Sequence, residues 1–105
     1  MPPIAVCALD VFAPGSVRIV VSGEVRIGVF NAGGELYAIE DRCSHDDGPL
    51  AEGDFDADEC VVVCPRHGAE FDVRTGVPRT LPAYVPVATF PVSIVDGMVV
   101  VDVPA

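Results

Sequence analysis

Two short motifs in this 105-residue chain each pair a cysteine with a histidine. Residues 43–45 read Cys-Ser-His, residues 64–67 read Cys-Pro-Arg-His, and eighteen residues lie between the two motifs. The chain contains no other histidine. Thiolate sulfur suits zinc and iron–sulfur clusters, and imidazole nitrogen suits zinc and iron. The pattern therefore predicts a metal site, whose candidate ligands are Cys43, His45, Cys64 and His67.

The other two cysteines, Cys7 and Cys60, are expected to be structural. Both lie in apolar strand-like segments, where a buried thiol usually packs as a small hydrophobic side chain. The Met-Pro-Pro-Ile start lacks the basic segment and long apolar stretch of a secretory signal, which predicts a cytoplasmic protein. In a reducing cytoplasm, four cysteines indicate metal binding or catalysis before they indicate disulfides.

The charge balance excludes several kinds of partner. The chain carries 16 acidic residues, six arginines and no lysine, which gives a net charge of −10. Binding to nucleic acid or to an anionic membrane depends on clustered basic residues, so we expect neither. The longest unbroken apolar run, Ile4 to Leu9, has six residues, whereas a transmembrane helix needs about 18 or more.

The elements that must position the metal site are predicted to be β-strands. Valine and isoleucine recur in short blocks that Gly, Pro, Asn or Asp interrupt, and no long window shows a helical period. Asp96-Gly97 is typical of a type I′ hairpin turn, and Asn31-Ala32-Gly33-Gly34 contains residues that also favour a turn. The pattern indicates an all-β fold, an antiparallel β-sandwich or barrel framework. Its expected strands are Ile4–Leu9, Ser16–Val21, Val25–Asn31, Glu35–Glu40, Cys60–Cys64, Glu70–Val73, Val87–Val95 (bent or at an edge, because of Pro91) and Met98–Val103.

One stretch, residues 41 to about 80, departs from this framework. It holds three of the four cysteines and both histidines among turn residues and short strands. Ten of the 16 carboxylates lie between residues 35 and 59. Such a stretch buries little apolar area for its length, so a further interaction has to order it. We predict one domain, residues 1–105, in which this stretch forms an inserted, loop-rich lobe organised by a bound metal.

At their observed separation, the two motifs resemble the signature of the Rieske [2Fe–2S] family. The likeness covers residues 43–50 and 64–72, includes Thr75-Gly76, and extends to residues 81–83, which resemble the family's proline-containing loop over the cluster. The resemblance implies a Rieske-type fold and one [2Fe–2S] cluster. In that family two thiolates hold one iron and two imidazoles the other. By that pattern Cys43 and Cys64 would bind the inner iron, and His45 and His67 the outer iron near the surface.

The departures from the family pattern bear on the reduction potential. High-potential Rieske proteins bridge two further cysteines in the cluster loops, where this chain has Gly48 and Arg66. They also place serine and tyrosine hydroxyls near the cluster sulfurs, where this chain has Ala69 and Phe71. Fewer hydrogen bonds to sulfur stabilise the reduced cluster less, and nearby carboxylates act in the same direction. These features predict a low potential, on the order of −150 mV, which Arg66 would oppose if it lies near the cluster.

The resemblance is greatest to the ferredoxin components of bacterial aromatic-ring dioxygenase systems. It implies a soluble one-electron carrier that accepts electrons from a flavin-dependent reductase and passes them to a Rieske non-haem iron oxygenase. The chain has room for the cluster domain but not for a flavin domain or a second metal site. We therefore expect an electron-transfer component, monomeric and without catalytic activity of its own.

Other roles stay open for the same residues. The module could be a permanent small subunit of an oxidoreductase, or a redox accessory of cofactor assembly. A permanent subunit should show an apolar patch away from the cluster. A zinc-stabilised β binding module is a third alternative, since zinc accepts the same ligand types.

The acidic residues allow a further hypothesis about docking. Residues 46 and 47, together with Glu52, Asp54, Asp56, Asp58 and Glu59, could form a docking surface beside the exposed histidines, although a charge run is often only a solvated face.

Overall fold

The computed structural model of the chain describes residues 3–44, 48–81 and 83–103. Within these ranges the chain forms ten β-strands and one short 3-10 helix. The strands build three antiparallel sheets, in the orders β1-β10-β9, β2-β3-β4-β8 and β5-β6-β7. The elements are β1 (Ile4–Ala8), η1 (Leu9–Val11), β2 (Val17–Ser22), β3 (Val25–Ala32), β4 (Glu35–Glu40), β5 (Phe55–Asp56), β6 (Val61–Val63), β7 (Glu70–Asp72), β8 (Thr89–Phe90), β9 (Val92–Val95) and β10 (Met98–Val101).

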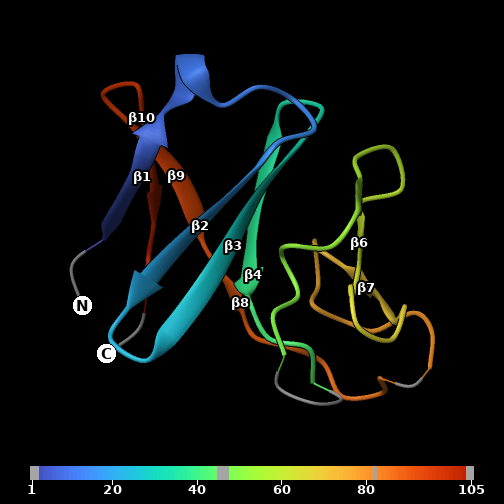
Figure 1. The fold of residues 1–105 in the computed structure, drawn as a ribbon. Coiled ribbons are helices and arrows are strands. Elements are labelled where there is room, and N and C mark those ends of the chain that lie inside the picture. The colour runs from blue at the N-terminus through green and yellow to red at the C-terminus, as the bar shows by residue number, and fades with distance from the viewer. Residues whose placement is uncertain (1–2, 45–47, 82, 104–105) are drawn as a thin grey trace.

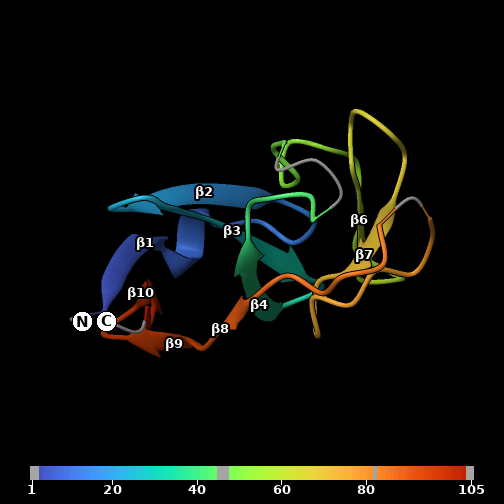
Figure 2. The same cartoon turned by 90° about the horizontal axis from the view of Figure 1, so that it is seen from below.

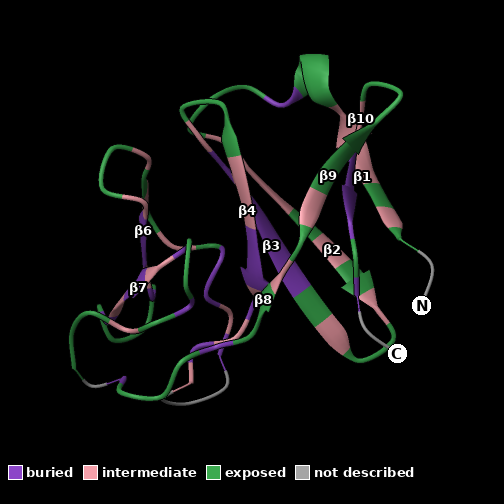
Figure 3. Ribbon diagram, turned by 180° about the vertical axis from the view of Figure 1, so that it is seen from behind, coloured by how far each residue is buried: buried purple, intermediate pink, exposed green. Residues whose placement is uncertain are grey.

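Two of these sheets form a sandwich that serves as the framework. Seen from below, β2 and β3 lie on one side, and β9 and β10 lie on the other (Figure 2). Ile27 and Val29 of β3 share one buried cluster with Val99 and Val101 of β10. Figure 3 shows this buried layer along β3 and β10. The expected antiparallel β-sandwich is therefore confirmed.

The third sheet, β5-β6-β7, lies in the lobe at one end of the framework (Figure 1). The lobe has its own buried cluster, to which Leu50, Val62 and Phe71 belong. Phe30 of β3 also belongs to it, and its ring lies 4.9 Å, centroid to centroid, from that of Phe55 in β5. Because Phe30 comes from the framework, this aromatic contact packs the lobe against β3.

The predicted strand Val87–Val95 is wrong as a single element. It is two strands, since β8 pairs with β4 and β9 pairs with β10. Pro91 lies between them and lacks the N–H that a continuous ladder would need. Its carbonyl instead accepts a hydrogen bond from the N–H of Asp102, at 3.0 Å. The chain therefore changes sheets at the proline.

Three shorter features also differ from the sequence-based expectations. The two-residue strand β5 and the helix η1 are not predicted by the sequence pattern, because neither is long enough to show a period. The expected strand Cys60–Cys64 extends only from Val61 to Val63, and Cys60 lies in the preceding turn with a φ of 57°.

No helix within the described residues is long and apolar enough to cross a membrane.

The turns predicted at Asp96-Gly97 and within Asn31-Ala32-Gly33-Gly34 are confirmed, the second at Gly33-Gly34, which have φ of 66° and 104°. Asp96 and Gly97 both have positive φ, at 51° and 79°, as a type I′ turn requires. The side chain of Asn31 donates to the carbonyl of Phe12 at 2.8 Å and accepts from the N–H of Gly34 at 2.7 Å. Asn31 therefore fixes the turn between β3 and β4 and also ties it to the segment before β2.

Gly28 marks a close contact between the framework and the lobe. It lies in β3, and a Cβ added there would be 2.6 Å from the Cβ of Ala51 and 3.1 Å from Cε1 of Phe30. Ala51 and Phe30 are both buried. The absence of a side chain at Gly28 thus allows the segment around Ala51 to lie directly on β3.

We predict that Gly28→Ala lowers the free energy of unfolding by about 1–3 kcal/mol, because the added methyl group overfills this contact. Urea unfolding of the two proteins measures the difference. Adding Ala51→Gly to Gly28→Ala removes the opposing methyl group, so the double variant should be more stable than Gly28→Ala alone. A double variant that is less stable than Gly28→Ala would show that the contact is not the cause.

Candidate metal centre

The first cysteine–histidine motif lies in a loop that follows β4, residues 41–51, here called the Cys43 loop. Cys43 is completely buried, and its N–H donates to the carbonyl of Gly48 at 2.8 Å. This hydrogen bond joins the two described sides of the loop. The predicted ligand His45 lies outside the described residues.

The second motif lies in a loop between β6 and β7, residues 64–69, here called the Cys64 loop. Cys64 is 1% exposed, and its N–H donates to the carbonyl of Ala69 at 2.8 Å. The carbonyl of Cys64 accepts from the N–H of Gly68 at 2.9 Å, and Gly68 has a φ of 76°, which favours glycine. His67 is exposed to solvent in this loop. The loop therefore buries its thiol and presents its imidazole to solvent.

The two loops are closed by the same kind of hydrogen bond. In each, the cysteine N–H donates to the carbonyl five residues later, and both hydrogen bonds measure 2.8 Å. Cys43 and Cys64 belong to the same buried cluster as Leu50 and Phe71, and all four cysteines of the chain are thiols rather than disulfides. The fold thus places two buried thiols, 21 positions apart in the sequence, in the same buried cluster.

These observations fit the donor set of a [2Fe–2S] cluster. A Rieske cluster takes two thiolates on one iron and two imidazoles on the other, so three ligands need not converge on a single ion. In the described part of the chain, no three His, Cys, Asp or Glu side chains form a group that could hold one metal ion. Buried thiols paired with a solvent-exposed imidazole match the inner and outer positions that the resemblance implies.

A third segment, residues 80–86, lies beside both loops. The hydroxyl of Ser44 donates to the carbonyl of Val85, and the hydroxyl of Thr80 accepts from the N–H of Glu70 at 2.9 Å, next to the Cys64 loop. Leu81 and Tyr84 are 77% and 79% exposed. The segment therefore exposes apolar side chains beside the two ligand loops. Pro82, part of the expected proline-containing loop, lies outside the described residues.

The acidic residues do not all lie near this segment. Glu52, Asp54, Asp56, Asp58 and Glu59 are exposed. The turn between β5 and β6, which carries Asp58 and Glu59, lies at the upper end of the lobe in Figure 1, whereas residues 83–86 lie at its lower end. The side chain of Asp56 accepts from the N–H groups of Asp58 and Glu59 at 3.1 and 3.2 Å. Asp56, Asp58 and Glu59 thus shape a turn rather than a surface beside the ligand loops.

Asp41 is a further residue of this site that the sequence motifs do not indicate. Its carboxylate is completely buried and accepts hydrogen bonds from the guanidinium of Arg26 and from the N–H groups of Leu50 and Ala51. The strand pattern held a usable signal. In the hairpin register of β3 and β4, Ile27 pairs with Glu40, so the next position would have placed Arg26 opposite Asp41.

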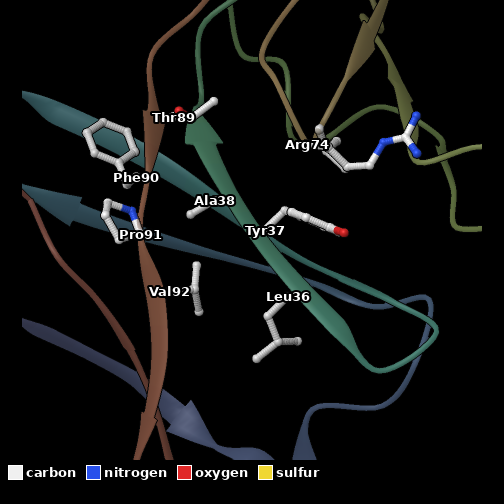
Figure 4. Close-up of a pocket in the computed structure, with 9 residues that line it drawn as sticks. Leu36, Tyr37, Ala38, Arg74, Thr89, Phe90, Pro91 and Val92 are labelled. Atoms are coloured by element: carbon white, nitrogen blue, oxygen red, sulfur yellow. The ribbon is translucent and has the colours of Figure 1, made fainter.

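One hollow, lined in part by residues of the lobe, lies away from the ligand loops. Figure 4 shows its walls, formed by β4, residues 73–74 and the segment from Thr89 to Val92, around a volume of about 420 Å³. The hydroxyl of Tyr37 donates to Glu35 at 2.6 Å, and this hydrogen bond raises the pKa of Tyr37. The described residues that line the hollow include neither a cysteine nor a histidine.

Comparisons with known proteins identify the family of the chain. A family model of the Rieske [2Fe-2S] domain matches residues 3–91. The chain therefore belongs to the Rieske [2Fe–2S] domain family, and the expected type of cofactor is a Rieske iron–sulfur cluster.

Curated relatives narrow the comparison to ferredoxins. The ferredoxin subunit of 3-phenylpropionate/cinnamic acid dioxygenase from Escherichia coli K12 is 45% identical over 78 residues, 74% of this chain and 73% of that protein. The ferredoxin subunit of anthranilate 1,2-dioxygenase from Burkholderia cepacia is 43% identical over 96 residues, 91% of this chain and 87% of that protein. These relatives confirm the expectation of an electron-transfer component of the ferredoxin type.

Solved structures of ferredoxins have a fold similar to that of this chain. The ferredoxin of carbazole 1,9a-dioxygenase from Nocardioides aromaticivorans IC177 superposes with a TM-score of 0.89 at 34% identity, covering 96% of this chain and 97% of that one. A chain in a complex of reduced oxygenase and oxidised ferredoxin of carbazole 1,9a-dioxygenase superposes with a TM-score of 0.88 at 39% identity, covering 94% of this chain and 91% of that one. The Rieske ferredoxin fold is therefore confirmed over nearly the whole chain.

The turn after the Cys64 loop gives a pH-dependent prediction. The side chain of Asp72 accepts from Nε and Nη2 of Arg74 at 3.1 and 2.9 Å, and from its backbone N–H at 2.8 Å. These hydrogen bonds hold the pKa of Asp72 below its usual value, against the opposing effect of burial. A carboxylate with a lowered pKa stabilises the fold above its unfolded pKa, and this effect is lost as the pH falls through the folded pKa.

We therefore predict that Asp72→Asn lowers the free energy of unfolding at pH 7, and that the difference from the parent protein shrinks as the pH falls below about 4. Urea unfolding at a series of pH values measures it. Asp102→Asn, at an exposed position on the framework, serves as the control for the loss of one negative charge. A difference that stays constant down to the acid transition would contradict the role of the Asp72–Arg74 pair.

Proposed function

We propose that the chain carries single electrons to the Rieske non-haem iron oxygenase of an aromatic-ring dioxygenase system, on one [2Fe–2S] cluster held by Cys43, His45, Cys64 and His67. The observation that carries the proposal is the matched pair of loops, each of which closes on a buried cysteine. The exposed His67 supplies the solvent-facing end. The ferredoxin names of the relatives support the role of carrier.

Different residues of the chain form the buried side and the surface side of the site. The cluster, when bound, supplies one-electron chemistry. The thiols of Cys43 and Cys64 lie in an apolar cluster, which keeps water from the inner side of the site. The imidazole of His67 lies at the surface, where a partner can approach it closely. This arrangement gives electrons one short path between the buried site and the surface.

The partner assignment rests on relatives and on one surface. A related ferredoxin is known in a complex with its oxygenase, and we extend that partner to this chain. We assign the donor role to a flavin-dependent reductase, by the family resemblance. Leu81, Tyr84 and Val85 are at least 51% exposed and lie beside the Cys43 loop through the Ser44–Val85 hydrogen bond. They supply the apolar centre of the docking surface, and transient electron-transfer contacts need only a small area.

We further propose that the protein is a cytoplasmic monomer and that residues 1–105 form one domain.

A permanent-subunit role is the second candidate, because one observation favours it. Leu9, Val11, Ile94 and Val95 are 40–60% exposed, and they lie on the framework at the end away from the lobe (Figure 1). Leu9 and Ile94 line the same shallow hollow. Size-exclusion chromatography at micromolar concentration separates the roles: a carrier elutes as a monomer without its partner, whereas a permanent subunit co-purifies with one.

The ligand assignment predicts a contrast between cysteines. Cys64→Ser should abolish the visible absorption of the purified protein, because the serine hydroxyl is a poor iron ligand beside a thiolate. The matched control, Cys60→Ser, lies four residues earlier in a turn and should keep the spectrum. Because Cys64 is buried, His67→Ala tests the site without opening the core, and it should also lose the Rieske spectrum. A spectrum retained in both Cys64→Ser and His67→Ala would overturn the assignment.

The surroundings of the Cys64 loop predict the potential. Ala69 and Phe71 are completely buried and carry no hydroxyl group that could donate to sulfur. The reduced cluster therefore lacks the stabilisation that side-chain hydroxyls give in high-potential relatives. Redox titration followed by visible circular dichroism should give a potential on the order of −150 mV. A clearly positive potential would contradict this reading of the two residues.

Docking through the apolar segment predicts a kinetic effect. Tyr84→Ser should slow electron transfer to the oxygenase by about tenfold, because an exposed aromatic anchor at an interface centre typically contributes more than 1 kcal/mol. The reduction potential should not change. Tyr37→Phe, in the hollow away from the ligand loops, is the matched control. Equal rates for Tyr84→Ser and the parent protein, in stopped-flow mixing with the oxygenase, would place the interface elsewhere.

A further inference from the structure

The carboxylate of Asp41 accepts four hydrogen bonds at the base of the Cys43 loop. Its Oδ2 accepts from Nε and Nη2 of Arg26 at 3.2 and 3.0 Å. Its Oδ1 accepts from the N–H groups of Leu50 and Ala51 at 2.8 and 2.6 Å. The carboxylate is completely buried, whereas the side chain of Arg26 is 49% exposed. A buried carboxylate needs such partners, since an unsatisfied one is costly.

These hydrogen bonds join the two ends of the Cys43 loop to each other and to the framework. Asp41 begins the loop, and Leu50 and Ala51 end it. The N–H of Asp41 also donates to the carbonyl of Arg26 at 2.7 Å, so main chain and side chain both attach the loop to β3. Two positions further along β3, Gly28 leaves the space that Ala51 occupies. Asp41 thus holds the two ends of the loop together, and the Cys43–Gly48 hydrogen bond lies within the segment that these ends enclose.

The same base extends to the Cys64 loop. The N–H of Gly53 donates to the carbonyl of Leu50 at 3.1 Å, and the N–H of Val63 donates to the carbonyl of Asp54 at 2.9 Å. A Cβ added at Gly53 would lie 1.6 Å from the carbonyl oxygen of Val63, so the two backbones are in direct contact there. Val63 immediately precedes Cys64. A short path of main-chain contacts therefore connects Asp41 with the second cysteine.

We propose that Asp41 is a positioning residue for the cluster: it holds the Cys43 loop closed and sets the placement of Cys43 relative to Cys64. This inference rests on the proposed function, because it assigns Asp41 a role toward the bound [2Fe–2S] group. Asp41 holds the loop that carries Cys43 rather than contacting the irons. Its loss therefore changes the retention and the electronic signature of the cluster beyond any effect on the stability of the fold.

The chemistry at this position requires a carboxylate. All four N–H groups around Asp41 are donors, and a carboxylate is an acceptor at both oxygens. Asparagine has the same shape but one amide nitrogen, which cannot accept. It would place two further donors against either Arg26 or the N–H groups of Leu50 and Ala51. Asp41→Asn therefore perturbs the base of the loop with almost no change in volume.

The chain offers a matched control in Asp72. Its carboxylate also accepts from an arginine side chain and from a backbone N–H, both of Arg74. It lies at the end of β7 away from the Cys64 loop, since Val63 pairs with Glu70 and Val61 with Asp72. Asp72→Asn thus removes a similar pair from the same lobe without touching either loop base.

The experiment compares the purified, cluster-loaded parent protein with Asp41→Asn, Arg26→Gln and Asp72→Asn. Cluster loss to an iron chelator is followed by visible absorption, the reduced proteins are examined by electron paramagnetic resonance, and unfolding of each apoprotein is measured in urea. Asp41→Asn should lose its cluster roughly 10- to 100-fold faster, as for other residues that orient metal ligands, with shifted g-values. Arg26→Gln should show a smaller effect in the same direction, and Asp72→Asn less than a twofold change.

Each outcome bears on the inference separately from the proposed function. If the parent protein shows a Rieske signal and Asp41→Asn matches Asp72→Asn in cluster loss and g-values, Asp41 is only structural and the inference fails alone. If Asp41→Asn does not fold, Arg26→Gln decides in the same way, since it leaves the hydrogen bonds of Leu50 and Ala51 in place. If the parent protein shows no Rieske signal, the proposed function fails, and the inference with it.

Discussion

Two backbone hydrogen bonds define the site on which the rest of the structure depends. Each runs from a cysteine N–H to the carbonyl five residues later, and each closes a loop that buries a thiol. Isolated loops of this size would not stay closed, because the closure of a short chain costs entropy. The β-sandwich, the aromatic contact between Phe30 and Phe55, and the base around Asp41 supply the order that the loops lack. The framework therefore serves mainly to hold two short loops against one apolar cluster.

Much of this could be predicted from the sequence because the signals were local. The strand predicted at Val25–Asn31 and the turn at Asp96-Gly97 each depend on neighbouring residues, and the structure has both, as β3 and as a turn with two positive φ angles. The spacing of the two Cys–His motifs identified the family before any geometry was known. Residues whose roles come from local backbone preferences or from a fixed motif are those that a single sequence can reveal.

The features that were missed depend on contacts between distant residues. Pro91 divides a run of β-forming residues because its two sides pair with different sheets, which no local pattern shows. Gly28 reads as an ordinary strand residue until Ala51 is placed beside it. Asp41 reads as one acid among ten until the β3–β4 register brings Arg26 opposite it. The acidic residues between positions 35 and 59 are the opposite case. They are close in sequence, but the turn between β5 and β6 carries some of them away from the ligand loops.

The proposed function requires that two thiolates and two imidazoles share one binuclear cluster. Pulsed electron paramagnetic resonance on the reduced protein, prepared with ¹⁵N-labelled histidine, can detect the two imidazole ligands. We expect hyperfine coupling from two histidine nitrogens, which an all-cysteine cluster cannot give. A reduced iron–sulfur signal without histidine coupling, or a colourless protein that contains zinc, would contradict it.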